Sequence, residues 1–525
     1  MNDESKTINE NGERSEGNVI DRIFGATDHG LFWPVFIILA VALTIVFISP
    51  EASQKFLNTI KNGLLKYFSW GFLLGVAATT AFALYVGFSK YGMLKLGKDD
   101  EKPEFSFMAW VSMLFSCGIG IGFIFWGVAE PLYHMYQAPH VTDPGIAGTA
   151  AAIPMAVQLT ILDWGIHGWA LFAVGGLAIA FPAYRLGKPM TIAMGLYGLI
   201  GNRAKNGTLA KVVDGLGVIG TIGGNGASLG MGMLSITYAL RHLFGIHIDI
   251  GGQVVTMLLI IAAYTISAAS GIDKGIRILS LTNMWLAFFV LLYLLFLGPT
   301  TYLLNLVTQE FGEYLSNFVK MTFWSDAGRL EQRPWLGWWV LFYWLWWVTY
   351  IPFCGGFIAR ISRGRTLREY ILGVIIVPVL ITILWFSVVG GSACYVEATQ
   401  TAPLWETIQK DSGAGIYMLL DQYPIGFFVS IVVLFNLVIF AVTTSDSASY
   451  FVAMQMAKGN PNPKVAMRLL WGATIGLIGL IFQFAGGLNA LKALAIVVGA
   501  PFFIVGIAFI FSSYKMLKMA DRGEM

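Results

Sequence analysis

Long apolar stretches constrain the fold of this chain more than any other feature. Each is about 18 residues or longer, enough to cross a bilayer hydrocarbon core of roughly 30 Å. Inside lipid every backbone N–H and C=O group needs a partner within the protein, so such stretches are predicted to be helices. The twelve predicted spans run near 30–49, 68–90, 105–130, 150–181, 211–238, 252–270, 276–304, 335–359, 369–391, 424–446, 465–486 and 490–514.

The composition agrees with a membrane protein. Hydrophobic residues make up 56% of the 525 residues and charged residues 12%, whereas soluble domains carry about 25% charged residues. So few charges cannot cover the surface of a soluble fold, which excludes a soluble enzyme, a nucleic-acid binder and a disordered protein. The net charge of +3 indicates no acidic partner, and the three cysteines lack the spacing of a disulfide framework or a zinc site.

The distribution of Lys and Arg predicts the orientation in the membrane. If the N-terminus is cytoplasmic, these residues gather in the inner segments, as the positive-inside rule requires. Both termini are therefore expected in the cytoplasm. Two amphipathic segments, Glu51–Phe68 and Leu303–Phe323, are too polar to span. The first is expected to join the first two spans and the second to lie along the outer interface, either as ordinary loop helices or as gating elements.

The chain is predicted to divide as two plus five plus five spans. Helices at 105–130 and 335–359 open the two halves, and both are interrupted, which is a sequence sign of a transporter binding site. The expected units are a tail at 1–27, two extra helices at 28–104, a first repeat with its amphipathic helix at 105–325, a second repeat at 326–514 and a tail at 515–525.

Alternating glycines mark the first interrupted helix. Gly118, Gly120 and Gly122 each weaken a helix by roughly 1 kcal/mol relative to Ala. An unwound turn here would free N–H groups for a carboxylate and carbonyls for a cation. Close packing of helices is the alternative interpretation of the same glycines.

Aromatic residues crowd the second interrupted helix, which Pro352 breaks. Trp346, Trp347 and Tyr350 are spaced i, i+1 and i+4, so they share one side of a helix. Such a side can enclose a quaternary ammonium, which is held by cation–π attraction rather than by hydrogen bonds. The alternative, a tryptophan belt at a membrane surface, suits the tryptophans nearer the start of this helix.

Two further spans carry polar residues. Asp163 stands inside the fourth span, where a carboxyl group costs free energy and is usually functional. The alternative interpretation is a structural salt bridge between Asp163 and His167, one turn further along the helix. Thr443 and Thr444 in the tenth span offer hydroxyl oxygens to a small cation, or they simply bond to the preceding carbonyls.

Together these motifs resemble the betaine/carnitine/choline transporter family. The resemblance rests on FYWLWWVTYIPF with ARISRGRTLREY, on GIGIG followed by FWGVAEP, on DWGIHGWA and on TTSDSAS. It implies an all-α integral membrane protein with 12 transmembrane helices, built as a leucine-transporter-type 5+5 inverted repeat with two extra N-terminal helices. It also implies a homotrimer in a bacterial-type inner membrane.

The resemblance also assigns residues to sites. The implied substrate site comprises Trp346, Trp347, Tyr350, Trp164, Trp169, Ile119, Gly120, Ile121 and Gly122. The implied sodium site comprises Ser116, Ile119, Phe440, Thr443 and Thr444, and a second sodium site comprises Thr221, Asn225, Asn283 and Phe353. Sodium is the expected coupling ion, and no other cofactor is expected.

Departures from the family pattern affect the substrate. Tyr350 resembles carnitine carriers, whereas betaine carriers usually have Trp there. The family's choline carriers tend to have Asp at the position of Gly122, so its absence favours a zwitterion. Asp163 stands where the family usually has His, and this acid could serve as a proton site or a counter-charge for choline. Sodium-independent exchangers have Arg where Asn283 stands, so sodium symport is favoured.

The sequence therefore predicts a secondary transporter, not an enzyme, that imports a glycine betaine or carnitine type of zwitterion by sodium symport. A sodium-independent exchanger and a proton-coupled choline carrier are the alternatives within this class. A channel is the alternative from another class, but a buried aromatic cage makes a poor pore.

Overall fold

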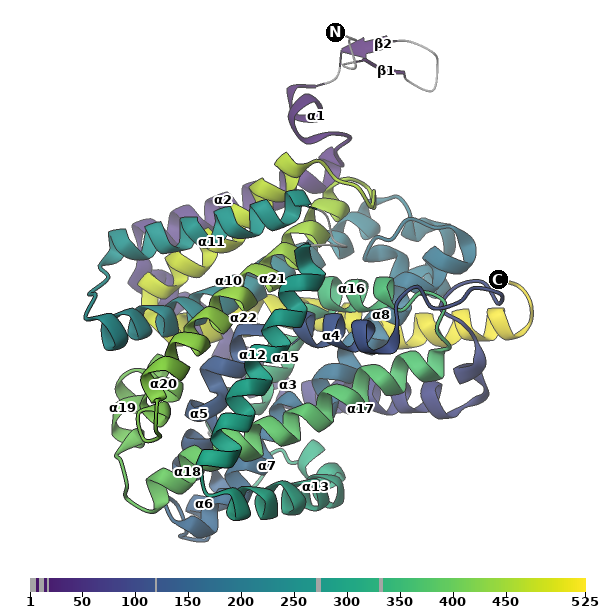
Figure 1. The fold of residues 1–525 in the computed structure, drawn as a ribbon. Coiled ribbons are helices and arrows are strands. Elements are labelled where there is room, and N and C mark those ends of the chain that lie inside the picture. Colours follow the sequence, from purple (N-terminus) through teal and green to yellow (C-terminus); the bar gives the residue numbers. More distant parts are fainter. Residues whose placement is uncertain (1–5, 9–13, 17, 119, 271–274, 330–333) are drawn as a thin grey trace.

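The computed structural model describes residues 6–8, 14–16, 18–118, 120–270, 275–329 and 334–525. Helices form the body of the protein (Figure 1). Within the described ranges the strands are β1 (Lys6–Ile8) and β2 (Arg14–Glu16), which pair antiparallel in the polar tail. The first helices are α1 (Val19–Phe24), α2 (His29–Ile48), α3 (Pro50–Phe88) and η1 (Lys90–Met93).

The middle of the chain contains α4 (Phe107–Gly118), α5 (Gly120–Gln137), α6 (Pro139–Thr142), η2 (Ala150–Ala152), α7 (Ile153–Trp164), α8 (Ile166–Leu186), η3 (Ala193–Leu196), α9 (Tyr197–Ile200), η4 (Gly201–Ala204), α10 (Thr208–Phe244), α11 (Ile250–Ser270), α12 (Gly275–Leu297) and α13 (Thr300–Thr322). The last part contains α14 (Pro334–Trp338), α15 (Val340–Tyr350), η5 (Ile351–Gly355), α16 (Gly356–Ile361), α17 (Leu367–Trp385), η6 (Phe386–Gly390), α18 (Gly391–Ala398), α19 (Leu404–Lys410), η7 (Ser412–Ala414), α20 (Gly415–Leu420), α21 (Gly426–Met456) and α22 (Val465–Asp521).

All twelve predicted spans fall on helical segments. By length and composition, 8 helices in the described part of the chain can cross a membrane, so the chain is a multi-pass membrane protein. The count of twelve crossings and the inverted repeat stay predictions. The two last spans are joined in α22, where the non-helical φ and ψ angles of Gly486 and Gly487 separate them.

The amphipathic segment Glu51–Phe68, predicted to join the first two spans, is helical. It is the first half of α3, which continues without a break through the second predicted span to Phe88. Because no proline or strained glycine interrupts these residues, the helical hydrogen-bond ladder runs on from the polar half into the apolar half.

The segment that carries the aromatic cage lies at the centre of the fold. In the most apolar 18-residue stretch of Pro334–Ile361, 100% of the residues are buried. In the corresponding stretch of His29–Ile48, 28% of the residues are buried. Helix α15 packs against α8, α10 and α22, and α5 packs against α7, α10 and α21. The predicted cage is therefore enclosed by protein, whereas α2 lies at the periphery.

Three central helical segments are interrupted close to the predicted sites. The glycine run separates α4 from α5, and Gly120 has a φ of +42°, a value that favours glycine. A π-helical turn, η5, contains Pro352 and follows α15, as the sequence predicted. The third break was not predicted: Gly165, at φ −92° and ψ −138°, separates α7 from α8.

Candidate functional site

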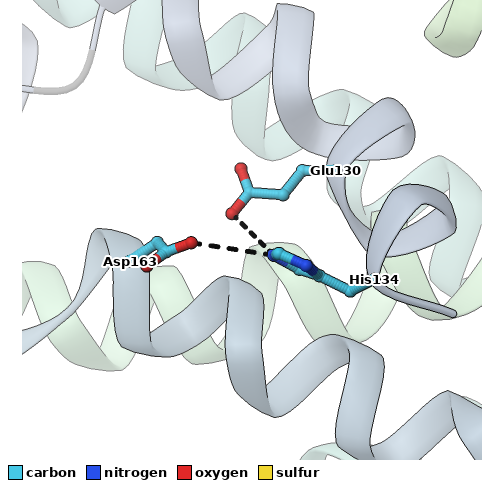
Figure 2. Close-up of side chains that lie close together, drawn as sticks. All are labelled: Glu130, His134 and Asp163. Atoms are coloured by element: carbon cyan, nitrogen blue, oxygen red, sulfur yellow. Dashed lines mark hydrogen bonds and ion pairs between the residues drawn. The ribbon is translucent and has the colours of Figure 1, made fainter. Parts of the chain in front are cut away.

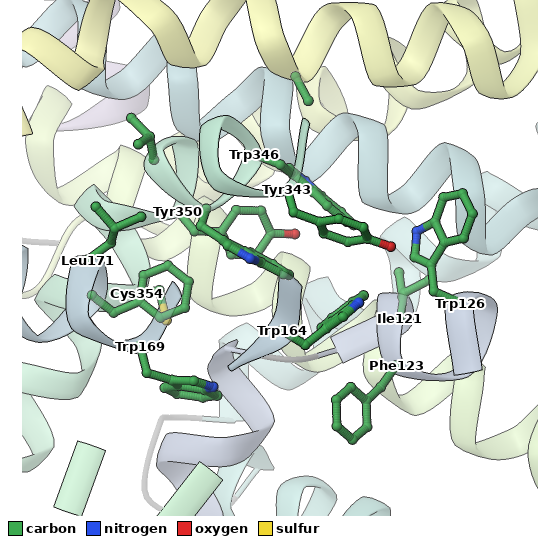
Figure 3. Packing of buried hydrophobic residues seen from close by; sticks show 14 of the residues in the cluster. Ile121, Phe123, Trp126, Trp164, Trp169, Leu171, Tyr343, Trp346, Tyr350 and Cys354 are labelled. Carbon is green, nitrogen blue, oxygen red and sulfur yellow. The ribbon is translucent and has the colours of Figure 1, made fainter. Parts of the chain in front are cut away.

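The predicted aromatic residues form a buried cluster at the end of α15. Trp346 and Trp347 are stacked with ring centroids 5.1 Å apart, and Tyr350 stands edge-on to both at 6.0 Å. Trp164, the last residue of α7, meets Trp347 at 4.9 Å. Figure 3 shows Trp164, Trp346 and Tyr350 lying near one another among the buried rings. These four residues are called the cage below.

Hydrogen bonds fix the polar edges of the cage. Trp346 Nε1 donates to the carbonyl of Gly224 at 3.2 Å, and Trp347 Nε1 donates to the carbonyl of Asp163 at 2.8 Å. The Tyr350 hydroxyl is bonded to the Ser228 hydroxyl of α10. The backbone therefore satisfies the ring N–H groups of Trp346 and Trp347, which need no further polar partner. Trp346 also stacks on Phe342 at 5.3 Å, so the rings pack on one another.

The predicted residues around the cage take different positions. Gly122 lies directly beneath Trp164, because a Cβ there would stand 2.4 Å from Trp164 Cη2. Ile121 is buried, and a Cβ on Gly232 would lie 3.0 Å from its side chain. Trp169 is linked to the cage through Phe172, which it meets at 5.6 Å. Ile119, predicted for both sites, lies outside the described residues.

A triad of buried polar side chains adjoins the cage (Figure 2). Glu130 and His134 stand one turn apart on α5, and Asp163 faces them from the end of α7. His134 Nε2 lies 3.4 Å from Glu130 Oε1 and 3.6 Å from Asp163 Oδ2. All three side chains have 0% exposure. Glu130, His134 and Asp163 are called the buried triad below.

The buried triad is bonded to the cage. Glu130 Oε2 accepts a hydrogen bond from Trp164 Nε1 at 2.8 Å and another from the Tyr343 hydroxyl. The backbone of Asp163 holds Trp347, as described above. Two of the four cage rings are therefore positioned by residues that carry a titratable carboxyl group.

The alternative pairing of Asp163 with His167 is wrong. An unbroken helix would place these residues one turn apart, but Gly165 ends the helix between them. His167 Nε2 lies 2.9 Å from the Thr322 hydroxyl of α13, and its ring stacks on Trp344 at 4.5 Å. The break leaves Asp163 facing α5 instead.

The amphipathic helix α13 covers this break. The Tyr314 hydroxyl accepts a hydrogen bond of 3.0 Å from the backbone N–H of Ile166, the first residue of α8. The first N–H groups of a helix have no intrahelical partner, so α13 supplies one. The predicted interfacial segment therefore contacts the helix ends that carry Asp163 and Trp164.

An open cavity of about 490 Å³ lies next to the buried triad. Lys492 of α22 lines it, and its side chain is buried. Its Nζ lies 4.1 Å from the ring centroid of Trp339 and 4.3 Å from that of Phe342. A lysine ammonium is thus already held by cation–π contacts beside the predicted site.

The predicted sodium site is described only in part. Thr444 Oγ1 is buried without a hydrogen bond partner among the described residues, and a Cβ on Gly120 would lie 2.8 Å from it. Thr443 Oγ1 bonds to the carbonyls of Ile439 and Phe440, at 3.0 and 3.3 Å. The glycine run and the tenth predicted span therefore meet at Thr444. Ile119 and the side chain of Ser116 lie outside the description.

The residues of the second predicted sodium site are all buried. Thr221 and Asn225 stand one turn apart on α10, where Asn225 Nδ2 bonds to the Thr221 carbonyl at 3.2 Å. Asn283 of α12 pairs with Asn436 of α21. Phe353, in η5, packs on Tyr350 at 4.8 Å. Burial and these contacts do not test ion binding, so this site stays a prediction.

The arginine run after α16 binds the loop that precedes α4. Arg363 donates to both carboxylate oxygens of Glu101, at 3.1 and 2.6 Å. These bonds lower the pKa of Glu101, although partial burial opposes them. The run therefore fixes a loop between helices in addition to its expected role in orientation.

Sequence reasoning missed four residues of the site: Glu130, His134, Tyr343 and Lys492. Glu130 and His134 are four residues apart in one helix, a spacing that places two side chains on one face. Lys492 is a charge inside a predicted span, which is a functional signal by default. Their meeting with Asp163 depends on helix packing and on the break at Gly165, which no local pattern indicated.

The fold and the site define a polytopic helical membrane protein with a buried aromatic cluster beside two buried carboxyl groups. The sequence matches the family described as BCCT, betaine/carnitine/choline family transporter, over residues 30–522. This chain belongs to that family, as the motifs indicated, and it is a transporter rather than an enzyme.

Similar proteins come from several bacteria. The chain is 37% identical over 493 residues to the glycine betaine transporter OpuD of Bacillus subtilis, covering 94% of this chain and 95% of the relative. It is 33% identical to a glycine betaine transporter of Acinetobacter baylyi, covering 94% and 74%. It is 36% identical to the high-affinity choline transport protein of Escherichia coli, covering 92% and 71%.

Proposed function

We propose that this protein imports a trimethylammonium zwitterion, of the glycine betaine or carnitine type, by sodium symport. The observation that carries the proposal is the cage: four buried aromatic rings with their N–H groups engaged by backbone or by Glu130. A quaternary ammonium has no N–H donor, so aromatic faces are its natural partner. The relatives named as glycine betaine transporters support the substrate class.

Transport by purified protein in liposomes tests the proposal. Radiolabelled glycine betaine, carnitine and choline are offered with an inward sodium gradient and with potassium in its place. Saturable glycine betaine or carnitine uptake that collapses without sodium is expected. Equal uptake in both media would reject sodium symport and favour an exchanger or a proton-coupled carrier. Flux that does not saturate would favour a channel.

Sodium coupling is tested further at Thr444. Its unpartnered hydroxyl next to Gly120 supports an oxygen ligand for a small cation. Thr444→Val keeps the shape but removes the oxygen, and it is expected to raise half-maximal sodium at least tenfold. Thr443→Val is expected to have a smaller effect, because the Thr443 hydroxyl already bonds to two carbonyls.

Thr382→Val is the matched control for this experiment. The Thr382 hydroxyl is also buried without a partner in the described structure, but it belongs to α17, outside the predicted sodium site. Its sodium dependence should equal that of the wild type. An equal rise in half-maximal sodium for Thr382→Val and Thr444→Val would contradict a specific ligand role for Thr444.

The assembly and orientation are part of the proposal. A homotrimer and a bacterial-type inner membrane follow from family resemblance, and cytoplasmic termini follow from the distribution of Lys and Arg. Light scattering of the protein in detergent, corrected for bound detergent, is expected to give three times the 57.5 kDa of the chain. Tags at either end should be accessible only from the inside of right-side-out vesicles.

A further inference from the structure

The buried triad contains more carboxyl groups than its histidine can satisfy. One oxygen of each carboxyl and His134 Nε2 all lie within 4.8 Å of one another. Nε2 carries at most one hydrogen, so it can donate to only one of the two carboxyls at a time. The other carboxyl must carry its own proton or remain a bare carboxylate in a dry interior, which is costly.

The two carboxyls are not equivalent. Glu130 Oε2 receives hydrogen bonds from Trp164 and Tyr343, and donors of this kind stabilise the ionised form. Neither oxygen of Asp163 receives a hydrogen bond from the described residues, beyond the 3.6 Å approach of His134. Of the two carboxyls, Glu130 is the one better stabilised as an anion, and Asp163 is the one that holds the proton more readily.

The buried amine of Lys492 on α22 acts electrostatically on both carboxyls. When Lys492 and Glu130 are both charged, the group is neutral with Asp163 protonated and carries one negative charge with Asp163 ionised. The other titratable groups that act on the triad from adjoining elements are His140, Tyr314 and Tyr343.

The triad is coupled to the cage through Trp164 and Trp347, which bond to Glu130 and to the backbone of Asp163. A negative charge at Asp163 would attract a cation in the cage and repel the carboxylate of a zwitterion. We propose that Asp163 is a proton-exchange site that sets whether the cage prefers a zwitterion, when protonated, or a cation such as choline, when ionised.

This inference rests on the proposed function, and binding measurements distinguish the failure of the two. Dissociation constants of choline and glycine betaine are measured on the full-length protein at fixed sodium, between about pH 5.5 and 9. Where Asp163 is protonated in the empty protein, each bound choline displaces one proton. The dissociation constant of choline is then expected to fall up to about tenfold for each unit by which the pH rises. The dissociation constant of glycine betaine is not expected to fall.

Asp163→Asn, which cannot ionise, should flatten the pH dependence of choline binding. Glu310→Gln is the matched control, because Glu310 is also a fully buried carboxyl without a hydrogen bond partner in the described structure, but it lies on α13. This control should retain the wild-type slope. The same slope in Asp163→Asn and the wild type would overturn the inference.

A direct count of protons keeps the test independent of the variant's folding. Choline added to the wild-type protein in weak buffer should release up to one proton per site, whereas glycine betaine should release none. Choline binding without proton release at any pH in this range would refute the inference and leave the proposed function intact. Absence of both choline and betaine binding would refute the proposed function. A choline slope that disappears with EDTA would assign the triad to a divalent cation instead.

Discussion

Gly122→Ala is expected to disturb the cage although it adds a single methyl group. The new Cβ would lie 2.4 Å from Trp164 Cη2 and 3.3 Å from Cζ3. The indole must therefore move by about 1 Å to restore ordinary contact. The contacts that position it include the 2.8 Å hydrogen bond to Glu130 and the 4.9 Å contact with Trp347, and a shift of this size weakens both.

The size of the effect follows from these two contacts. A hydrogen bond to a charged group is worth about 1.5–3 kcal/mol, and an aromatic pair about 0.5–1.5 kcal/mol. These contacts hold the Trp164 ring in the cage. When the displaced ring loses its own cation–π contact with the trimethylammonium substrate, worth about 2 kcal/mol, the affinity is expected to fall roughly 30-fold. Quenching of tryptophan fluorescence by the substrate, or binding of radiolabelled glycine betaine, measures the change.

Two further variants isolate the cause. Gly71→Ala in α3 is the matched control, because a Cβ there meets nothing within 4 Å, and it should bind substrate as the wild type does. Trp164→Phe removes the ring atoms that the new methyl group strikes. In a protein that already carries Trp164→Phe, Gly122→Ala should therefore cause little further loss of substrate affinity. Full additivity of the two changes, or wild-type affinity of Gly122→Ala alone, would refute the steric argument.

Three other predictions follow from the same structure. Trp346→Ala should weaken substrate binding about 30-fold, since a desolvated cation–π contact is worth about 2 kcal/mol; isothermal titration checks this, and wild-type affinity would remove Trp346 from the cage. Tyr350→Trp should favour smaller betaines, because a larger ring narrows the cage; competition between glycine betaine and carnitine measures the preference, and an unchanged ratio would contradict it. Arg363→Gln should lower the melting temperature near pH 7 more than near pH 3, because Arg363 lowers the pKa of Glu101, so the stabilisation exists above the unfolded pKa and is lost as pH falls through the folded one. A difference that stays constant across this pH range would assign the role of Arg363 to other contacts.

Much of the fold could be predicted because a membrane-spanning helix can be recognised from a single continuous apolar stretch of sequence. Apolar length gave the helical segments, and glycine or proline gave two of the three breaks. The adjacency of Trp346, Trp347 and Tyr350 was predictable for the same reason, since the spacing within one helix determines which side chains share a side. The length of the apolar stretches alone could not show that the helix at Glu51–Phe68 continues into the second span.

The buried triad could not be predicted from spacing, because it joins helices that are not adjacent in one periodic pattern. Asp163 was singled out, yet the one partner considered for it, His167, belonged to the same predicted span. The break at Gly165 turns it toward His134 instead. A single glycine in an apolar stretch carries too little local signal to distinguish a break from close packing, so this contact depended on the three-dimensional arrangement.

Two residues of the cage lie at the ends of short helices. Trp164 ends α7, a helix of 12 residues, and Tyr350 ends α15, a helix of 11 residues. Such a helix is about 18 Å long, so a tilt of about 10° about its far end moves the tip by about 3 Å. That displacement is comparable with the spacing between the rings. Two small tilts of α7 and α15 about their far ends, Ile153 and Val340, would therefore move the aromatic faces apart or together, and the breaks beyond Trp164 and Tyr350 leave each tip free to move without bending a helix.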